Sequence, residues 1–215
     1  MIHELSKSNS VFNHFIREIR DVTIQGDRMR FRKNLERIGE IMAYEISKTL
    51  SYEPVEVTTP LGEASVDVVA EQPVICAILR AALPMHQGFL NYFDRAESAF
   101  AAAYRRHHKG GDFEIEVDYT SSPALDGKVL IIVDPMLATG SSIEMVYKQI
   151  LRRGTPSAVH VASAIATNTG IAHVRSRLPE HTTIWAGAID YELTAQAYIV
   201  PGLGDAGDLS YGRKD

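Results

Sequence analysis

Small and hydroxyl-bearing residues follow an acidic residue in the stretch from Asp134 to Ser142, which reads DPMLATGSS. Thr139, Gly140 and Ser141 offer hydroxyls and backbone N–H groups. At the N-terminus of a helix such groups bind phosphate, because the helix dipole and the unpaired N–H groups both favour an anion. A carboxylate such as Asp134 suits sugar hydroxyls or a metal ion. The stretch therefore predicts a sugar-phosphate site, with an ordinary strand-to-helix turn as the alternative interpretation.

Two other nucleotide-binding motifs are excluded. A Walker A loop needs Lys directly after its last glycine, whereas Ser141 follows Gly140 in this chain. The glycines from Gly202 to Gly207 satisfy the dinucleotide spacing GxGxxG, but that fingerprint must open a helix inside a βαβ unit. We expect no such helix here, because the chain ends at Asp215.

Two arginines stand at the ends of apolar stretches that have the composition of buried strands. Arg80 ends the strand expected within Pro73 to Leu90, and Arg105 follows Ala99 to Tyr104. Such a cation could bind an anionic ligand or could form a structural ion pair, and position alone leaves both open. The basic run from Arg106 to Lys109 is more simply a solvated turn. Its two adjacent His residues make a poor zinc pair, because no Cys or carboxylate accompanies them.

The residues around the phosphate-type loop predict a strand before it and a helix after it. Val129 to Val133 are all apolar and mostly β-branched, which is typical of a strand buried on both faces of a parallel sheet. From Ile143 to Leu151, apolar residues recur at helical spacing. Ser141 and Glu144 have the spacing of a capping box, and Gly154 can end the helix.

The rest of the chain has patterns of the same kinds. Two helices are expected within Val11 to Leu50, and the clearer one has an apolar face made of Phe31, Leu35, Ile38, Met42 and Ile46. A β-hairpin of Val55–Thr58 and Ala64–Val69 is expected, followed by a helix opened by Pro84. Apolar and polar residues alternate from Phe113 to Thr120, as in a strand with one buried face. The last expected elements are strands at Ala158–Ala166 and Thr183–Ile189 and a helix at Thr169–Leu178. This alternation predicts an α/β fold, a mainly parallel twisted sheet flanked by helices.

Composition limits the classes of protein to which the chain can belong. The net charge of −5 over 215 residues argues against general binding of nucleic acids or membranes, which would require a basic face. A lone cysteine, Cys76, cannot form an internal disulfide, and its apolar surroundings predict a buried thiol. No secretory leader or membrane-spanning run is expected, so we expect a cytoplasmic protein that is not bound to membranes.

Three segments in the same order resemble the motifs of uracil phosphoribosyltransferases, within the type I phosphoribosyltransferase family. DPMLATG is similar to the ribose-phosphate signature of that family, although Ser141 replaces its usual second Gly. ILRAALPM is similar to ILRAGLPM, with Ala82 in place of Gly, and a Cβ there narrows the backbone options. YIVPGLGDAGD, from Tyr198 to Asp208, is similar to the segment that holds the base. The resemblance extends from about Arg28 onward.

The resemblance implies a role for each residue that matches these motifs. Arg80, Arg105, Asp134 and Asp205 would be catalytic. The ligand phosphoribosyl pyrophosphate would be bound by Arg80, Arg105, Asp134, Pro135, Met136, Leu137, Ala138, Thr139, Gly140, Ser141, Ser142 and Asp205. Uracil would be bound by Ile199, Gly204, Asp205 and Ala206.

The implied reaction converts uracil and phosphoribosyl pyrophosphate into uridine monophosphate and pyrophosphate, with Mg²⁺ bound mainly through the substrate and no dedicated metal site. The strand at Phe113–Thr120 would be a flap over the active site. The alternatives are a phosphoribosyltransferase for another base and a non-catalytic ligand-sensing regulator. We expect one domain over 1–215, with helices and a hairpin arm in 1–70, a core in 71–190 and a base-binding loop in 191–215. A homodimer or higher homo-oligomer is expected, with the arm suited to dimerisation.

Overall fold

The centre of the molecule is a mainly parallel β-sheet. The computed structural model describes residues 1–107 and 113–213, and the side chains of residues 1–103 and 118–213. The strands lie in the order β1 (Ile2–Glu4), β10 (Thr183–Asp190), β9 (Ala158–Thr167), β7 (Val129–Val133), β4 (Val74–Leu79), β5 (Glu97–His107) and β6 (Phe113–Ser121), and β8 (Met136–Leu137) pairs with β9. β5 and β6 pair antiparallel, and the other neighbours pair parallel. The predicted fold class is confirmed.

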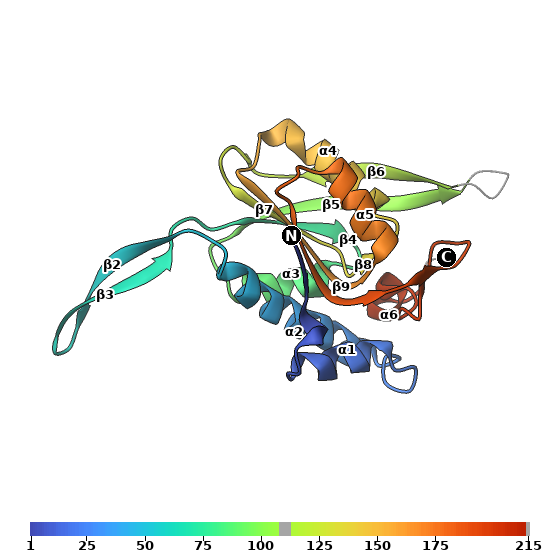
Figure 1. Ribbon diagram of the computed structural model, residues 1–215, viewed down its shortest axis with the longest axis horizontal. Helices are drawn as coiled ribbons and strands as arrows, with labels where there is room; N and C mark the ends of the chain where they lie inside the picture. Colours follow the sequence, from blue (N-terminus) through green and yellow to red (C-terminus); the bar gives the residue numbers. More distant parts are fainter. Residues whose placement is uncertain (108–112, 214–215) are drawn as a thin grey trace.

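Helices cover both faces of this sheet, and alternate strand residues point into two separate hydrophobic cores (Figure 1). In β4, Ile75 and Ala77 belong to one core, whereas Cys76 and Ile78 belong to the other. The first core is completed by α1 (Phe12–Arg20), α2 (Arg28–Ser47) and α3 (Leu83–Leu90), and the second by α4 (Ser141–Ile150) and α5 (Asn168–Arg177). Burial on both faces explains why the strands read as continuous apolar runs.

The helices and the buried thiol agree with the sequence patterns. All the residues of the predicted apolar face of α2 are buried, as is the Cys76 side chain. Burial raises the pKa of the Cys76 thiol to about 12. No helix among the described residues is long and apolar enough to cross a membrane.

The predicted hairpin extends away from the body of the molecule (Figure 1). It consists of β2 (Tyr52–Thr59) and β3 (Gly62–Val69), which pair antiparallel up to the contact of Thr59 with Gly62. Val55, Val57, Val66 and Val68 remain exposed on it. The hairpin therefore presents apolar side chains that nothing in the described chain covers.

The start of α4 differs from the sequence prediction. Gly140, in the left-handed conformation with φ of 83°, is the N-cap, and no side chain caps the helix. The predicted capping box of Ser141 and Glu144 is wrong, because the Glu144 carboxylate accepts hydrogen bonds from Lys148 and contacts His173 instead. The predicted stop is confirmed, since a 3-10 turn, Leu151–Arg153, ends at Gly154 with φ of 125°.

Several short elements were not predicted, because they are too brief to have a periodic pattern. A short helix, α6 (Ala206–Tyr211), follows the C-terminal glycines, but it lies outside any βαβ unit, so it does not restore the dinucleotide fingerprint. β1 adds to the edge of the sheet, where His3 stacks on Trp185 with ring centroids 4.0 Å apart. The other short elements are a 3-10 turn, Leu5–Lys7, and the antiparallel pair β11 (Glu192–Leu193) and β12 (Ile199–Val200).

Candidate active site

The strand order places a topological switch point at the carboxyl ends of β4 and β7. These two strands are parallel neighbours, yet the chain leaves them toward opposite faces of the sheet. After β4 it enters α3, which packs in the first core, and after β7 it enters α4, which packs in the second. Open α/β sheets bind ligands at such a switch point. Arg80 directly follows β4 and Asp134 directly follows β7, so both predicted residues stand at this switch point.

The loop between β7 and α4 has the geometry expected of a phosphate site. Gly140 is the N-cap in the left-handed conformation, and the first turn of α4 starts at Ser141. The Thr139 hydroxyl donates to Ser141 Oγ at 3.1 Å, and the Ser141 N–H donates to Thr139 Oγ1 at 3.4 Å. The first N–H groups of an α-helix lack partners within the helix, so they remain suited to an anion.

Close packing against the start of α5 fixes the path of this loop. Thr167 Oγ1 donates to the Ala138 carbonyl at 2.6 Å and accepts from the Gly170 N–H at 2.9 Å. A Cβ added to Gly140 would lie 2.9 Å from the Gly170 carbonyl oxygen, and one added to Gly170 would lie 2.5 Å from the Ala138 oxygen. Two glycines therefore permit the contact, and neither can be enlarged without movement of backbone.

Asp134 is held at the entrance of the same loop. Its carboxylate Oδ1 accepts from the Met136 N–H at 3.2 Å, and its own N–H donates to the Ala162 carbonyl at 3.1 Å. Pro135 is fixed in turn, because its carbonyl accepts from the Ile165 N–H at 2.9 Å. The carboxylate of Asp134 is thus attached to the loop that the sequence assigns to the phosphate.

Arg80 lies beside the C-terminal segment. Its Nη2 donates to Asp208 Oδ1 and to the Gly212 carbonyl, each at 3.1 Å. A Cβ placed on Gly207 would lie 3.2 Å from Asp205 Oδ1 and 3.9 Å from Arg80 Nη2, so Arg80 and Asp205 lie close together. The Arg80 Nε is buried and has no hydrogen-bond partner in the described part of the chain. Both interpretations of Arg80, a structural ion pair and an anion-binding group, therefore stay open, because it pairs with Asp208 and its Nε–H has no partner among the described residues.

The Ala82 substitution in the loop after β4 is compatible with the observed backbone. Ala82 is buried and adopts the right-handed helical conformation, with φ of −75°. A glycine is not required in that conformation, because an L-residue adopts it without strain.

The C-terminal segment presents open backbone next to Asp205. Gly204 has φ of 95°, and a Cβ added to it would meet no atom within 4 Å. The Asp205 carboxylate caps α6 by accepting from the Asp208 N–H at 2.9 Å, while Ile199 and Ala206 are buried. A flat ring could therefore approach the backbone at Gly204 closely.

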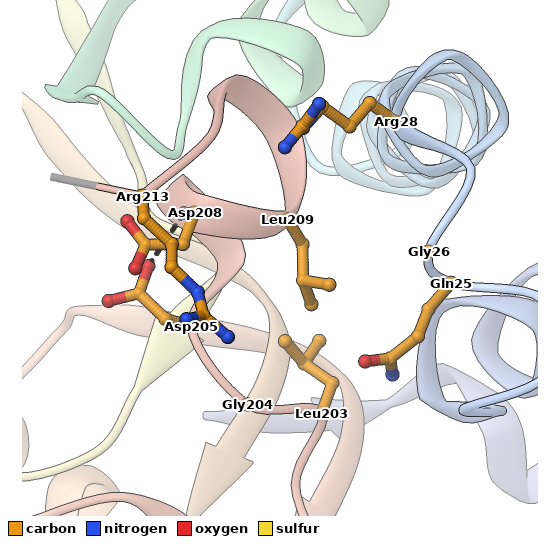
Figure 2. A pocket seen from close by; sticks show the side chains of 9 residues that line it. All are labelled: Gln25, Gly26, Arg28, Leu203, Gly204, Asp205, Asp208, Leu209 and Arg213. Atoms are coloured by element: carbon orange, nitrogen blue, oxygen red, sulfur yellow. Dashed lines mark hydrogen bonds between the residues drawn. The ribbon is translucent and has the colours of Figure 1, made fainter.

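A cavity that the sequence did not reveal borders the same segment. It has a volume of about 350 Å³, and its walls are Gln25, Gly26, Arg28, Leu203, Gly204, Asp205, Asp208, Leu209 and Arg213. Figure 2 shows the leucine side chains between Gln25 and Arg28 on one side and the two aspartates on the other. Gln25 and Gly26 lie between α1 and α2, and Arg28 is the first residue of α2. These residues belong to no sequence motif, so only the folded structure shows that they lie beside the C-terminal segment. The loop from Pro135 to Ser142 is not among the walls.

The predicted residues thus form two groups in the structure. Arg80 contacts the C-terminal segment, and the loop from Pro135 to Ser142 contacts α5, but no hydrogen bond between described residues joins the two groups. The predicted flap is β6, paired with β5. Arg105 lies in β5 opposite Ile115, and its side chain falls outside the described part of the chain, as do the side chains of Arg106 to Lys109.

The family comparison matches nearly the whole chain. The family model described as uracil phosphoribosyltransferase matches residues 6–212. A uracil phosphoribosyltransferase of Porphyromonas gingivalis is 53% identical over 214 residues, which cover 100% of this chain and 99% of the relative. Another from Pyrobaculum arsenaticum is 44% identical over 184 residues, 84% of this chain and 86% of the relative.

A solved structure of an Aquifex aeolicus protein is similar to this fold over its full length. Its TM-score is 0.87 at 32% sequence identity, with 99% of this chain and 98% of that chain covered. The likeness therefore includes the peripheral hairpin and the C-terminal segment as well as the central sheet.

The packing at Gly140 yields a first prediction. Gly140→Ala should weaken the binding of ribose 5-phosphate about tenfold or more, because a Cβ at positive φ costs on the order of 1–3 kcal/mol and would also press on Gly170. Gly26→Ala is the matched control, since a Cβ there meets nothing within 4 Å. Titration calorimetry measures both. An unchanged affinity in a folded Gly140→Ala protein would contradict the assignment of this loop to phosphate.

Proposed function

This chain belongs to the uracil phosphoribosyltransferase family, and we propose that it transfers the phosphoribosyl group of phosphoribosyl pyrophosphate to uracil. The products would be uridine monophosphate and pyrophosphate. The observation that carries this proposal is the full-length identity of 53% with a relative of that name. The switch point at β4 and β7 supports it independently, because it combines a phosphate-type loop with a carboxylate and an arginine.

The leaving pyrophosphate requires positive charge. Breaking its bond to C1 of the ribose creates an oxocarbenium-like sugar, and negative charge grows on the departing oxygens. Arg80 can stabilise that charge through the N–H groups that Asp208 and Gly212 do not take. Arg105, farther along the neighbouring strand β5, would supply a second guanidinium.

The phosphate loop would hold the other end of the same substrate. The backbone N–H groups from Leu137 to Ser142 and the hydroxyls of Thr139 and Ser141 would bind the 5′-phosphate. Asp134 would bind the ribose hydroxyls, because its carboxylate is attached to the start of this loop. Fixing both ends of the sugar orients C1 toward the base and lowers the entropic part of the barrier.

The base would be recognised by the backbone from Ile199 to Ala206, with Asp205 next to the reacting nitrogen. Uracil presents an acceptor at O4 and a donor at N3, whereas cytosine presents the reverse at both positions. Backbone N–H and C=O groups cannot rotate to suit the wrong base, so cytosine would leave buried polar groups unpaired. Discrimination of this kind can reach roughly 10⁴-fold.

Mg²⁺ would accompany the phosphoribosyl pyrophosphate. The oxygen donors of the proposed site are the Asp134 and Asp205 carboxylates and the Thr139 and Ser141 hydroxyls, and hard oxygen ligands of these types fit Mg²⁺. When bound, the ion would neutralise charge on the pyrophosphate. Among the described residues, no group of three or more ligating side chains could hold a metal alone.

Oligomerisation through the hairpin is part of the proposal. We expect a homodimer, because the exposed valines of β2 and β3 would gain burial against a second copy. Val55 and Val66 are directly opposed in the hairpin, so the double variant Val55→Glu with Val66→Glu should shift the mass toward the monomer in light scattering. Val22→Glu, at another exposed valine, should not. A wild-type monomer, or a dimer indifferent to the hairpin charges, would contradict this interface.

Turnover with a panel of bases tests the proposed reaction. With phosphoribosyl pyrophosphate and Mg²⁺, release of pyrophosphate should depend on uracil and should be slower by orders of magnitude with cytosine, hypoxanthine or guanine. Preference for a purine would favour the alternative of another phosphoribosyltransferase. Binding without turnover of any base would favour the ligand-sensing regulator.

Arginine variants connect that turnover to the switch point. Arg80→Ala should lower kcat/KM roughly a hundredfold, because removing one hydrogen-bond donor to transition-state charge costs about that much in other enzymes. Arg152→Ala, an exposed arginine after α4, is the matched control and should leave kcat/KM unchanged. Wild-type kcat/KM in the Arg80 variant would remove this arginine from the mechanism.

A further inference from the structure

A partly buried ion pair contacts the proposed base loop. Asp190 is the last residue of β10, and its side chain is only 7% exposed, against 22% for the Arg20 side chain at the end of α1. The pair is bidentate, with Nη2 donating to Oδ1 and Nη1 donating to Oδ2, each at 2.8 Å. A bidentate arginine–carboxylate pair fixes the relative orientation of the two side chains in addition to neutralising their charges. The two residues are 170 positions apart in the chain, so no local pattern predicts their contact.

The same pair binds both backbone groups of Gly202. The Gly202 N–H donates to Asp190 Oδ2 at 2.8 Å, and Arg20 Nη1 donates to the Gly202 carbonyl at 3.0 Å. Gly202 adopts a left-handed φ of 56°, and a Cβ on it would lie 2.1 Å from the Ile199 carbonyl oxygen. The ion pair therefore holds the centre of a tight turn whose two sides are Ile199 and Gly204.

We propose that Arg20 and Asp190 are positioning residues that set the backbone of the base loop for recognition of the pyrimidine ring. The inference depends on the proposed function, since Ile199 and the segment from Gly204 to Ala206 are the groups assigned to the base. Neither charged side chain is assigned to contact substrate. Both act through Gly202, whose peptide groups they hold on either side.

The charge pair suits this task better than backbone contacts alone would. The loop has a short strand, β12, before Gly202 and the short helix α6 after Gly204, so few local hydrogen bonds fix the turn between them. Recognition by N–H and C=O groups requires their placement within a fraction of an ångström, and a shift of about 1 Å can cost roughly a hundredfold. A bidentate pair that bonds both backbone groups of Gly202 limits such a shift.

The kinetic constants for the two substrates separate this role from general stability. Arg20→Gln and Asp190→Asn should each raise the KM for uracil about tenfold to a hundredfold and reduce the preference for uracil over cytosine. The KM for phosphoribosyl pyrophosphate and the calorimetric affinity for ribose 5-phosphate should stay within about twofold of wild type, because the phosphate loop is fixed by α5. Arg20→Lys, which keeps the charge but not the fork, should give an intermediate KM for uracil.

Arg30→Gln is the matched control. Arg30 of α2 forms a bidentate pair with Glu18 of α1 at 2.9 and 2.8 Å, but this pair is exposed and makes no bond to the base loop. Its loss should leave both KM values unchanged. If Arg20→Gln does not fold, the milder Arg20→Lys and the isosteric Asp190→Asn carry the same comparison.

Two results would overturn the inference. Folded Arg20 and Asp190 variants with an unaltered KM for uracil would remove their positioning role, and an equal rise in both KM values would indicate a purely structural one. Failure of the wild-type protein to use uracil at all would instead contradict the proposed function, whatever the variants do.

Discussion

The need to bury both faces of a parallel sheet is the constraint on which the rest of the structure depends. Because β4 and β7 are apolar on both faces, helices must cover both faces of the sheet, and α3 and α4, which follow these strands, cover different ones. The divergence makes the carboxyl ends of the two strands a topological switch point, where open α/β sheets bind ligands. Arg80 and Asp134 stand there as the first polar residues after buried strands. The chemistry of the site is therefore a consequence of how the sheet is covered.

Arginine side chains attach the C-terminal segment to this frame. Arg20 from α1 binds Gly202, Arg32 from α2 donates to the Ser210 carbonyl at 2.7 Å, and Arg80 after β4 binds Asp208 and the Gly212 carbonyl. Each bond comes from a different element of the core. A segment with little periodic structure thus obtains a defined position relative to Arg80, so the proposed base site and the proposed pyrophosphate site would be neighbours.

The sequence predicted those features that depend on local pattern. The strand and helix around Gly140, the hairpin, and the buried face of α2 follow from periodicity and turn residues, and all are observed. The predicted capping box was wrong because Gly140, which has no side chain, is the N-cap of α4. The Glu144 carboxylate pairs with Lys148 and His173 instead. The pair of Arg20 and Asp190 and the cavity wall at Gln25 to Arg28 could not be predicted, since they join residues far apart in the chain.

The central claim is that one site holds the phosphate on the loop at Gly140 and the base on the backbone at Gly204. A crystal structure with uridine monophosphate bound tests it most directly. The account predicts the phosphate at the N–H groups from Leu137 to Ser142, and the uracil ring hydrogen-bonded to main-chain groups between Ile199 and Ala206. A base bound instead among Gln25, Arg28 and Arg213, or a phosphate away from the N-terminus of α4, would contradict it.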